Sequence, residues 1–149
     1  MVNFFKLDQE ARSPTRNKEF DAGLDLYSLE SVFIPVGATK IIKTGVAIQI
    51  PVNMVGKIED RSSLAAKGLR TGAGVIDHGY SGEVGVVLHN FSAATEREPA
   101  LYQEGYNIKK GDKIAQLLIY PVETPAVKEV YLLWNNSERG SNGYGSSGR

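Results

Sequence analysis

GAGVIDHGYSGEVGVVLHN, residues 72–90, is the stretch that decides the class of fold. Glycines at positions 72, 74, 79 and 82 allow a tight hairpin and let main-chain groups approach a flat ligand closely. The second half places Val84, Val86 and Leu88 at alternate positions, which is the period of a half-buried strand. A glycine-rich turn that leads into such a strand indicates β-structure, and we predict an all-β fold.

The same period continues on both sides of this stretch. Over residues 39–50, branched apolar residues mostly alternate with others, and we predict one half-buried strand there. Two further strands are expected over residues 114–120 and 127–134, which are rich in branched and aromatic side chains. Only residues 63–69 (SLAAKGL) have the character of a short helical turn. Many short strands between turns favour a closed barrel or jelly roll, because exposed sheet edges must be closed or covered.

The composition limits the classes of protein that this chain can be. Its 149 residues are enough for one domain with its own core. Its 17 basic and 17 acidic side chains cancel, so we expect no binding to nucleic acid or to a membrane surface. The absence of cysteine excludes disulfides and thiolate catalysis, and two histidines argue against a histidine-built metal site. Without a leader or a membrane-spanning stretch we expect a cytoplasmic protein, or a nuclear one if the source is eukaryotic or viral.

The glycine-rich stretch also holds a candidate for catalysis. Asp77 follows the apolar pair Val75 and Ile76, which we expect to half-bury its carboxylate. A carboxylate in such a place can act as a general base on a water molecule within hydrogen-bond distance. Tyr80 supplies a flat face beside it. The alternative is a glycine-rich hairpin in which Asp77 only caps a turn.

Three other segments carry side chains suited to phosphate or metal. Arg61, Ser62 and Ser63 come at the start of the helical turn, where arginine and free N–H groups form an anion site. Asp25 and a second carboxylate flank a glycine, which suits the binding of water on a hard cation such as Mg²⁺. Gln116 is a polar residue within an apolar strand. The alternatives are a serine helix cap, a turn with solvated acids, and a satisfied strand residue.

The C-terminal end differs in composition from the rest of the chain. We predict a β-barrel domain over residues 1–136 and a mobile segment of the same domain over residues 137–149, SERGSNGYGSSGR, which has almost no aliphatic residue. Its glycines and serines can wrap phosphates, Arg139 can pair with them, and Tyr144 can stack on a base. A plain flexible end is the alternative from composition alone.

Five of these segments, in this order, resemble the five motifs of the trimeric dUTPase family. They are DAGLDLYS (21–28), DRSSLAAKGL (60–69), GAGVIDHGYSGEVGVVLHN (72–90), KKGDKIAQLLI (109–119) and RGSNGYGSSG (139–148). The resemblance covers nearly the whole chain. A single motif of this kind is weak evidence, whereas five in the family's order and at similar separations are specific.

The resemblance implies a distorted jelly-roll β-barrel subunit, a homotrimer, and a C-terminal arm that closes a neighbouring active site. It implies Asp77 as the residue that activates water, and Asp25 as the residue that holds the cofactor Mg²⁺ through water. The residues implied to contact uracil and deoxyribose are Gly74, Val75, Ile76, Tyr80, Gly85 and Tyr144. Those implied to contact phosphate are Arg61, Ser62, Ser63, Gln116, Arg139, Gly145, Ser146 and Ser147.

The implied reaction is hydrolysis of dUTP to dUMP and pyrophosphate by water attack on the α-phosphorus. It limits uracil in DNA and supplies dUMP for thymidylate synthesis. The alternatives are a sister enzyme of the dCTP deaminase type and a dUTP-responsive regulatory binding protein. The stretch from Ser92 to Tyr106 is longer than the usual family loop, and it is either a surface for a protein partner or a solvated loop. Asp60 stands where the family usually has proline or glycine, and this acid brings negative charge near the phosphate residues.

Overall fold

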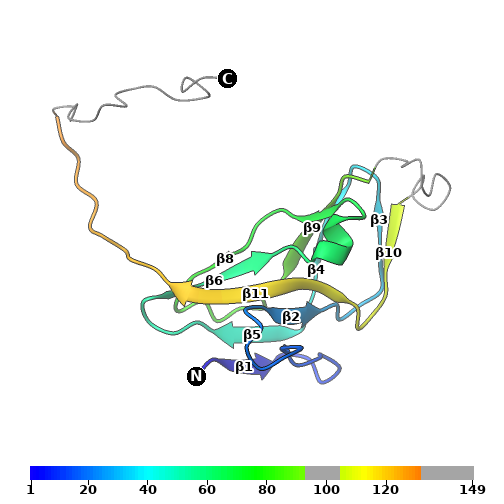
Figure 1. Ribbon diagram of the computed structural model, residues 1–149, viewed down its shortest axis with the longest axis horizontal. Helices are drawn as coiled ribbons and strands as arrows, with labels where there is room; N and C mark the ends of the chain where they lie inside the picture. The colour runs from blue at the N-terminus through cyan, green and yellow to red at the C-terminus, as the bar shows by residue number, and fades with distance from the viewer. Residues whose placement is uncertain (93–104, 132–149) are drawn as a thin grey trace.

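The protein, seen as a computed structural model that describes residues 1–92 and 105–131, is built almost wholly of antiparallel strands (Figure 1). Its elements, in chain order, are β1 (Asn3–Lys6), β2 (Leu24–Tyr27), β3 (Val32–Pro35), β4 (Thr39–Ile42), β5 (Val46–Gln49), β6 (Met54–Glu59), α1 (Ser62–Ala65), β7 (Leu69–Thr71), β8 (Val75–Ile76), β9 (Val86–Asn90), β10 (Gly105–Ile108) and β11 (Lys113–Pro121). The predicted all-β fold is confirmed.

The strands form four small sheets whose order does not follow the sequence. The largest has the order β2-β11-β6-β8, the next has the order β4-β9-β7, and β1-β5 and β10-β3 are pairs. Chain neighbours such as β4 and β5 therefore lie in different sheets, and the chain crosses between sheets repeatedly. This connectivity is that of a jelly roll, in which strands from distant parts of the sequence pair and little edge remains open.

One apolar core joins the sheets. It is formed by the inward side of alternating strand residues, so that Val84, Val86 and Leu88 are all buried, as their period predicts. They pack in one cluster with Ile42 of β4 and Leu117 of β11. Burial of branched side chains from every layer stabilises the fold and leaves the polar loops to form sites at its surface.

The single strand predicted over residues 39–50 is wrong, because the structure divides it into β4 and β5. The chain turns at Gly45, whose φ of 70° is in the left-handed region. A side chain at this glycine would also clash with Ala11. The Glu83 carboxylate accepts hydrogen bonds from the N–H groups of Thr44 at 3.0 Å and Gly45 at 2.7 Å, which satisfies the main chain at the break.

The strand predicted over residues 127–134 is also not observed in its described part. Residues 127–131 have no regular structure, and Val127 is 99% exposed. Figure 1 shows this segment, coloured orange, leaving the body of the molecule after β11. A strand needs a partner to pair with, and the described part of this chain offers none there. Residues 132–134 lie outside the described residues.

The predicted helical turn is confirmed, whereas the predicted surface loop is wrong at its described C-terminal end. The helical turn is α1, and Gly68, with a φ of 84°, ends the turn that follows it. No helix among residues 1–92 and 105–131 is long and apolar enough to cross a membrane. Ser92 has no regular structure but is buried, and Gly105 and Tyr106 belong to β10. Residues 93–104 and the predicted C-terminal segment, 137–149, lie outside the described part.

Candidate active site

A polar hollow of about 500 Å³ lies where β2, α1 and β11 meet. It is lined by Asn17, Asp21, Ala22, Gly23, Asp25, Arg61, Ser62, Ser63, Lys113 and Gln116. The structure therefore brings together all five predicted phosphate and metal residues that it describes, from three segments far apart in the sequence. Arg61 and Lys113 give the hollow two cationic side chains, and hydroxyl and amide groups complete a lining suited to an anionic ligand.

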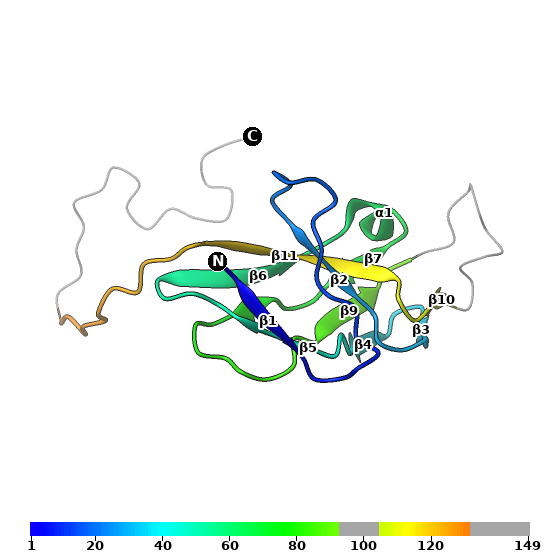
Figure 2. The ribbon, with the colours of Figure 1, turned by 90° about the horizontal axis from the view of Figure 1, so that it is seen from below.

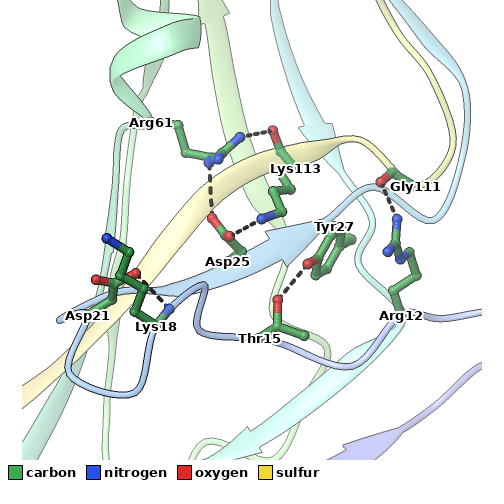
Figure 3. A network of polar contacts seen from close by, with 9 residues as sticks. All are labelled: Arg12, Thr15, Lys18, Asp21, Asp25, Tyr27, Arg61, Gly111 and Lys113. Atoms are coloured by element: carbon green, nitrogen blue, oxygen red, sulfur yellow. Dashed lines mark hydrogen bonds and ion pairs between the residues drawn. The ribbon is translucent and has the colours of Figure 1, made fainter.

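Asp25 is the centre of an ion-pair network in this hollow (Figure 3). Its Oδ1 lies 3.0 Å from Arg61 Nε, and its Oδ2 lies 2.6 Å from Lys113 Nζ. Arg61 Nη1 also donates to the main-chain oxygen of Lys113 at 3.3 Å. Asp25 is only 13% exposed, so its charge is poorly screened by water. The network holds the Arg61 guanidinium and the Lys113 ammonium beside one another before any ligand binds.

Lys113 is a site residue that strand periodicity did not predict. In a regular strand, residues three apart point to opposite faces, and Lys113 would face away from Gln116. The pairing of β11 with β2 shifts register between Lys113 and Ala115, so that Lys113 lies opposite Tyr27 and Gln116 opposite Asp25. This bulge turns both side chains to the side of the hollow. The motif KKGDKIAQLLI contains Lys113 but carries no signal of the bulge. Asn17, another lining residue that was not predicted, lies in a loop outside the five motifs.

The start of α1 faces the same hollow. Arg61 is the N-cap residue, and no side chain among the described residues caps the helix. The serine-cap alternative is therefore wrong for Ser62 and Ser63, which are exposed and line the hollow. Their hydroxyls therefore do not satisfy the helix start.

The predicted base contacts Gly74, Val75 and Ile76 pair with β6 rather than folding back as a hairpin. Gly74 O accepts a hydrogen bond from Ile58 N at 2.8 Å, and a Cβ at Gly74 would lie 2.6 Å from Ile58 O. The expected hairpin is thus replaced by a close approach of two main chains, which only glycine allows. Ile76 is half-buried against the core, and Val75 is exposed. Gly85 lies under the Ile41 side chain and does not line the polar hollow.

Asp77 and Tyr80 lie in the tight turn that follows β8. Tyr80 N donates to Asp77 O at 3.2 Å, and Gly79 has a φ of 88°. Tyr80 Oη donates to Glu83 O at 2.9 Å, and His78 Nδ1 lies 2.9 Å from Ile50 O, so the turn is tied at both ends. Asp77 is exposed, and the expected half-burial of its carboxylate is wrong for the single chain, because Val75 is itself exposed and Ile76 packs against the core.

This turn and the polar hollow are separate parts of the chain. Residues 78–81 line a different and mostly apolar hollow of about 440 Å³, shared with β1 and β5. In Figure 2 the loop that leads into β9 lies below the sheets, whereas α1 lies above them. Hence the described residues of one chain do not place Asp77 beside Arg61. The candidate site consists of two halves that point to different sides.

Comparison with known proteins identifies the family. The family model described as dUTPase matches residues 9–148, which include all five quoted segments. The chain belongs to the dUTPase family. It is 44% identical over 146 residues to the deoxyuridine 5'-triphosphate nucleotidohydrolase of Clostridium kluyveri, covering 96% of this chain and 94% of that protein. It is 41% identical over 149 residues to the human mitochondrial protein of that name, covering 99% of this chain and 55% of the relative.

A solved dUTPase structure is also similar over the full length. The dUTPase of Staphylococcus bacteriophage 80alpha, solved with dUPNHPP, superposes with a TM-score of 0.87 at 36% identity. The match covers 100% of this chain and 99% of that one. The family motif that contains Arg139, Tyr144, Gly145, Ser146 and Ser147 lies outside the described residues, and these roles stay predictions.

The acidic residues of this dUTPase fit a metal that is held mainly by its substrate. No three histidine or carboxylate side chains form a cluster in residues 1–92 and 105–131. Asp25 pairs with two cations, and Asp21 Oδ2 accepts from Lys18 N at 3.0 Å. Mg²⁺ retains several of its waters when nucleotide phosphates bind it. Two carboxylates at the edge of the hollow suit a contact with such waters rather than a cage of direct ligands.

Proposed function

We propose that this chain is a dUTP diphosphatase that hydrolyses dUTP to dUMP and pyrophosphate, with Asp77 activating the attacking water. The observation that carries the proposal is the polar hollow of a dUTPase-family chain, in which Arg61, Lys113 and Gln116 surround one space. Hydrolysis of dUTP would limit uracil in DNA and supply dUMP for thymidylate synthesis. The proposed location is the cytoplasm.

The polar hollow is the proposed phosphate half of the site. Phosphoryl transfer needs positioning and neutralisation of charge more than covalent catalysis. The Arg61 guanidinium can bind two phosphate oxygens, the Lys113 ammonium adds a second positive charge, and the Ser62 and Ser63 hydroxyls can donate. Gln116 lies on the strand opposite Asp25 and presents its amide to the same space. These groups hold the triphosphate while its α-phosphorus is attacked.

The turn after β8 is the proposed base half of the site. Main-chain groups near Gly74 would read the polar edge of uracil, and the Tyr80 ring would pack under the deoxyribose and leave no room for a 2′-hydroxyl. The Asp77 carboxylate would accept a proton from the water as it attacks. Support comes from the short turn, tied by His78 and Tyr80, which fixes the direction of Asp77.

Assembly of identical chains would join the two halves. We propose a homotrimer in which the turn of one chain meets the polar hollow of the next, and the segment 137–149 closes over the nucleotide. The separation of the two halves in the single chain supports this arrangement. Exposed large apolar side chains on the described surface, such as Phe5 and Ile41, are available for such contacts between chains.

The proposed cofactor is Mg²⁺, held by the triphosphate and contacted through water by Asp25. Bound there, the ion would neutralise phosphate charge. The dUTPase of phage phi11 of S. aureus is described as coordinating a structural Mg(II) ion, and it superposes with a TM-score of 0.78 at 34% identity over 89% of this chain and 98% of that chain. The role of Asp25 in this chain is to orient the water molecules bound to the metal, while Lys113 and Arg61 compensate the negative charge of Asp25.

Pyrophosphate release tests the proposal directly. Wild-type protein with Mg²⁺ should release pyrophosphate from dUTP and far less from dTTP, dCTP or UTP. Asp77→Asn, which keeps the size of the side chain but removes its basicity, should abolish turnover and leave dUTP binding measurable. Ammonia from dCTP without pyrophosphate from dUTP would instead identify a deaminase of the sister type.

A second role is favoured by one comparison. Phage dUTPases such as that of 80alpha control transfer of virulence genes by a proto-oncogenic G protein-like mechanism. A dUTP-responsive partner contact at the stretch from Ser92 to Tyr106 would be the counterpart here. Deleting residues 93–104 should then abolish capture of the partner and leave dUTP turnover intact.

A further inference from the structure

Asp60 stands immediately before the phosphate-binding segment but directs its carboxylate away from it. Its Oδ1 accepts hydrogen bonds from Thr71 N at 2.6 Å and Thr71 Oγ1 at 2.9 Å, and its Oδ2 accepts from Arg70 Nε. The side chain is 23% exposed, against 59% for Arg70. Both carboxylate oxygens are therefore engaged by residues at the end of β7.

Because the Asp60 carboxylate points away from Arg61, it does not neutralise the guanidinium that is proposed to bind phosphate. Arg61 pairs with Asp25 and with Lys113 O, and the charge of Asp60 is compensated by Arg70 instead. Burial acts to raise the pKa of Asp60, but the hydrogen bonds from Thr71 and Arg70 and the charge of Arg70 hold it below 3.8. Asp60 is thus charged at neutral pH without lowering the positive charge of the hollow.

The main chain of Asp60 makes a second connection. Gln116 Nε2 donates to Asp60 O at 2.8 Å, which sets the plane of the Gln116 amide at the wall of the hollow. On the other side of that amide, a Cβ at Gly23 would clash with Gln116 Oε1. Asp60 thereby links Gln116 on β11, a proposed phosphate contact, to the end of β7, the strand that precedes β8.

We propose that Asp60 is a positioning residue that fixes the spacing between Arg61, Gln116 and the Thr71–Gly74 segment. This inference rests on the proposed function, because it assigns Arg61 and Gln116 to the phosphates. The carboxylate of Asp60 ties this turn to β7 by three hydrogen bonds, at a position where the family usually has proline or glycine. Loss of the carboxylate would let the turn before α1 shift, and a shift of about 1 Å is enough to weaken a preorganised site severely.

Inorganic pyrophosphate is the probe that separates positioning from stability. We expect Asp60→Ala to raise the pyrophosphate dissociation constant, measured by calorimetry, by about tenfold, and the KM for dUTP by a similar factor. Both measurements are made at a temperature well below the Tm of the variant. Asp60→Asn keeps an oxygen for Thr71 and should stay within about threefold of wild type. Glu10→Gln, which removes the charge of an exposed ion pair with Lys110 outside the site, should change neither value.

A purely structural Asp60 would give a different pattern. Asp60→Ala would then lower Tm and leave pyrophosphate affinity and KM at wild-type values, and this result would overturn the inference. If Asp60→Ala does not fold, Thr71→Val removes one of the three bonds and should still weaken pyrophosphate binding measurably. Wild-type protein that binds pyrophosphate but does not hydrolyse dUTP would contradict the proposed function alone, because pyrophosphate binding needs no turnover.

Discussion

Tyr80 offers two groups that substitution can separate. The residue is 47% exposed in the turn that follows Asp77, and its hydroxyl donates to Glu83 O. We expect Tyr80→Ala to raise kcat/KM for UTP relative to dUTP by at least about tenfold, because the ring no longer excludes the ribose 2′-hydroxyl. Tyr80→Phe keeps the ring and should retain most of the discrimination. Competition assays with both nucleotides measure the ratio, and an unchanged ratio in Tyr80→Ala would show that the ring is not the excluding group.

Asp60 makes stability depend on pH in a known direction. Its pKa in the folded chain is below the ordinary value of 3.8, so the unfolded chain binds the proton more tightly. The stabilisation by its charge is therefore fully present above pH 3.8 and is lost as the pH falls through the lower, folded pKa. We expect the Tm difference between wild type and Asp60→Asn to be constant from pH 7 to pH 5 and to shrink below pH 4. A difference that grows on acidification would contradict this assignment.

The break between β4 and β5 depends on a side chain from another element. Glu83 Oε1 accepts from Thr44 N and Gly45 N, and Thr44 is buried. Glu83→Ala would leave two main-chain donors without their acceptor and should lower the free energy of unfolding by about 2 kcal/mol. Glu83→Gln keeps an oxygen at the same place and should cost less than half as much. Urea unfolding of the two variants measures both effects, and equal losses would mean that the charge, not the acceptor, stabilises the break.

Sequence periodicity predicted the elements that depend on local pattern. The buried face of β9, strand β11 and the short helix α1 each follow from residue order alone, because one face packs on the core or a glycine ends the turn. It did not predict the break at Gly45, which depends on Ala11 and Glu83 from distant segments. Residues 127–131 have a strand's composition, but a strand also needs a partner, which sequence does not show.

The candidate site was predictable to a similar extent. Motif order placed Asp25, Arg61 and Gln116 in one hollow, and the structure confirms that they meet. Lys113 was missed because its direction depends on a bulge against β2. The prediction that Asp77 is half-buried was wrong because Val75 is exposed and Ile76 packs against the core, so that neither covers this carboxylate in its own chain. At the scale of the molecule, these outward-facing residues are where a second copy would complete the site.

Mixed assemblies of two inactive variants test whether active sites form between chains. Arg61→Ala removes the phosphate half and leaves Asp77, whereas Asp77→Asn removes the base and leaves Arg61. If one chain supplies Asp77 and its neighbour supplies Arg61, trimers formed by co-refolding equal amounts should regain about a quarter of wild-type activity, since that fraction of sites receives both intact halves. Each variant refolded alone should remain inactive. Sites built within single chains would stay inactive in every mixture, because neither variant chain holds both residues. That result would exclude a site that combines Asp77 of one chain with Arg61 of its neighbour.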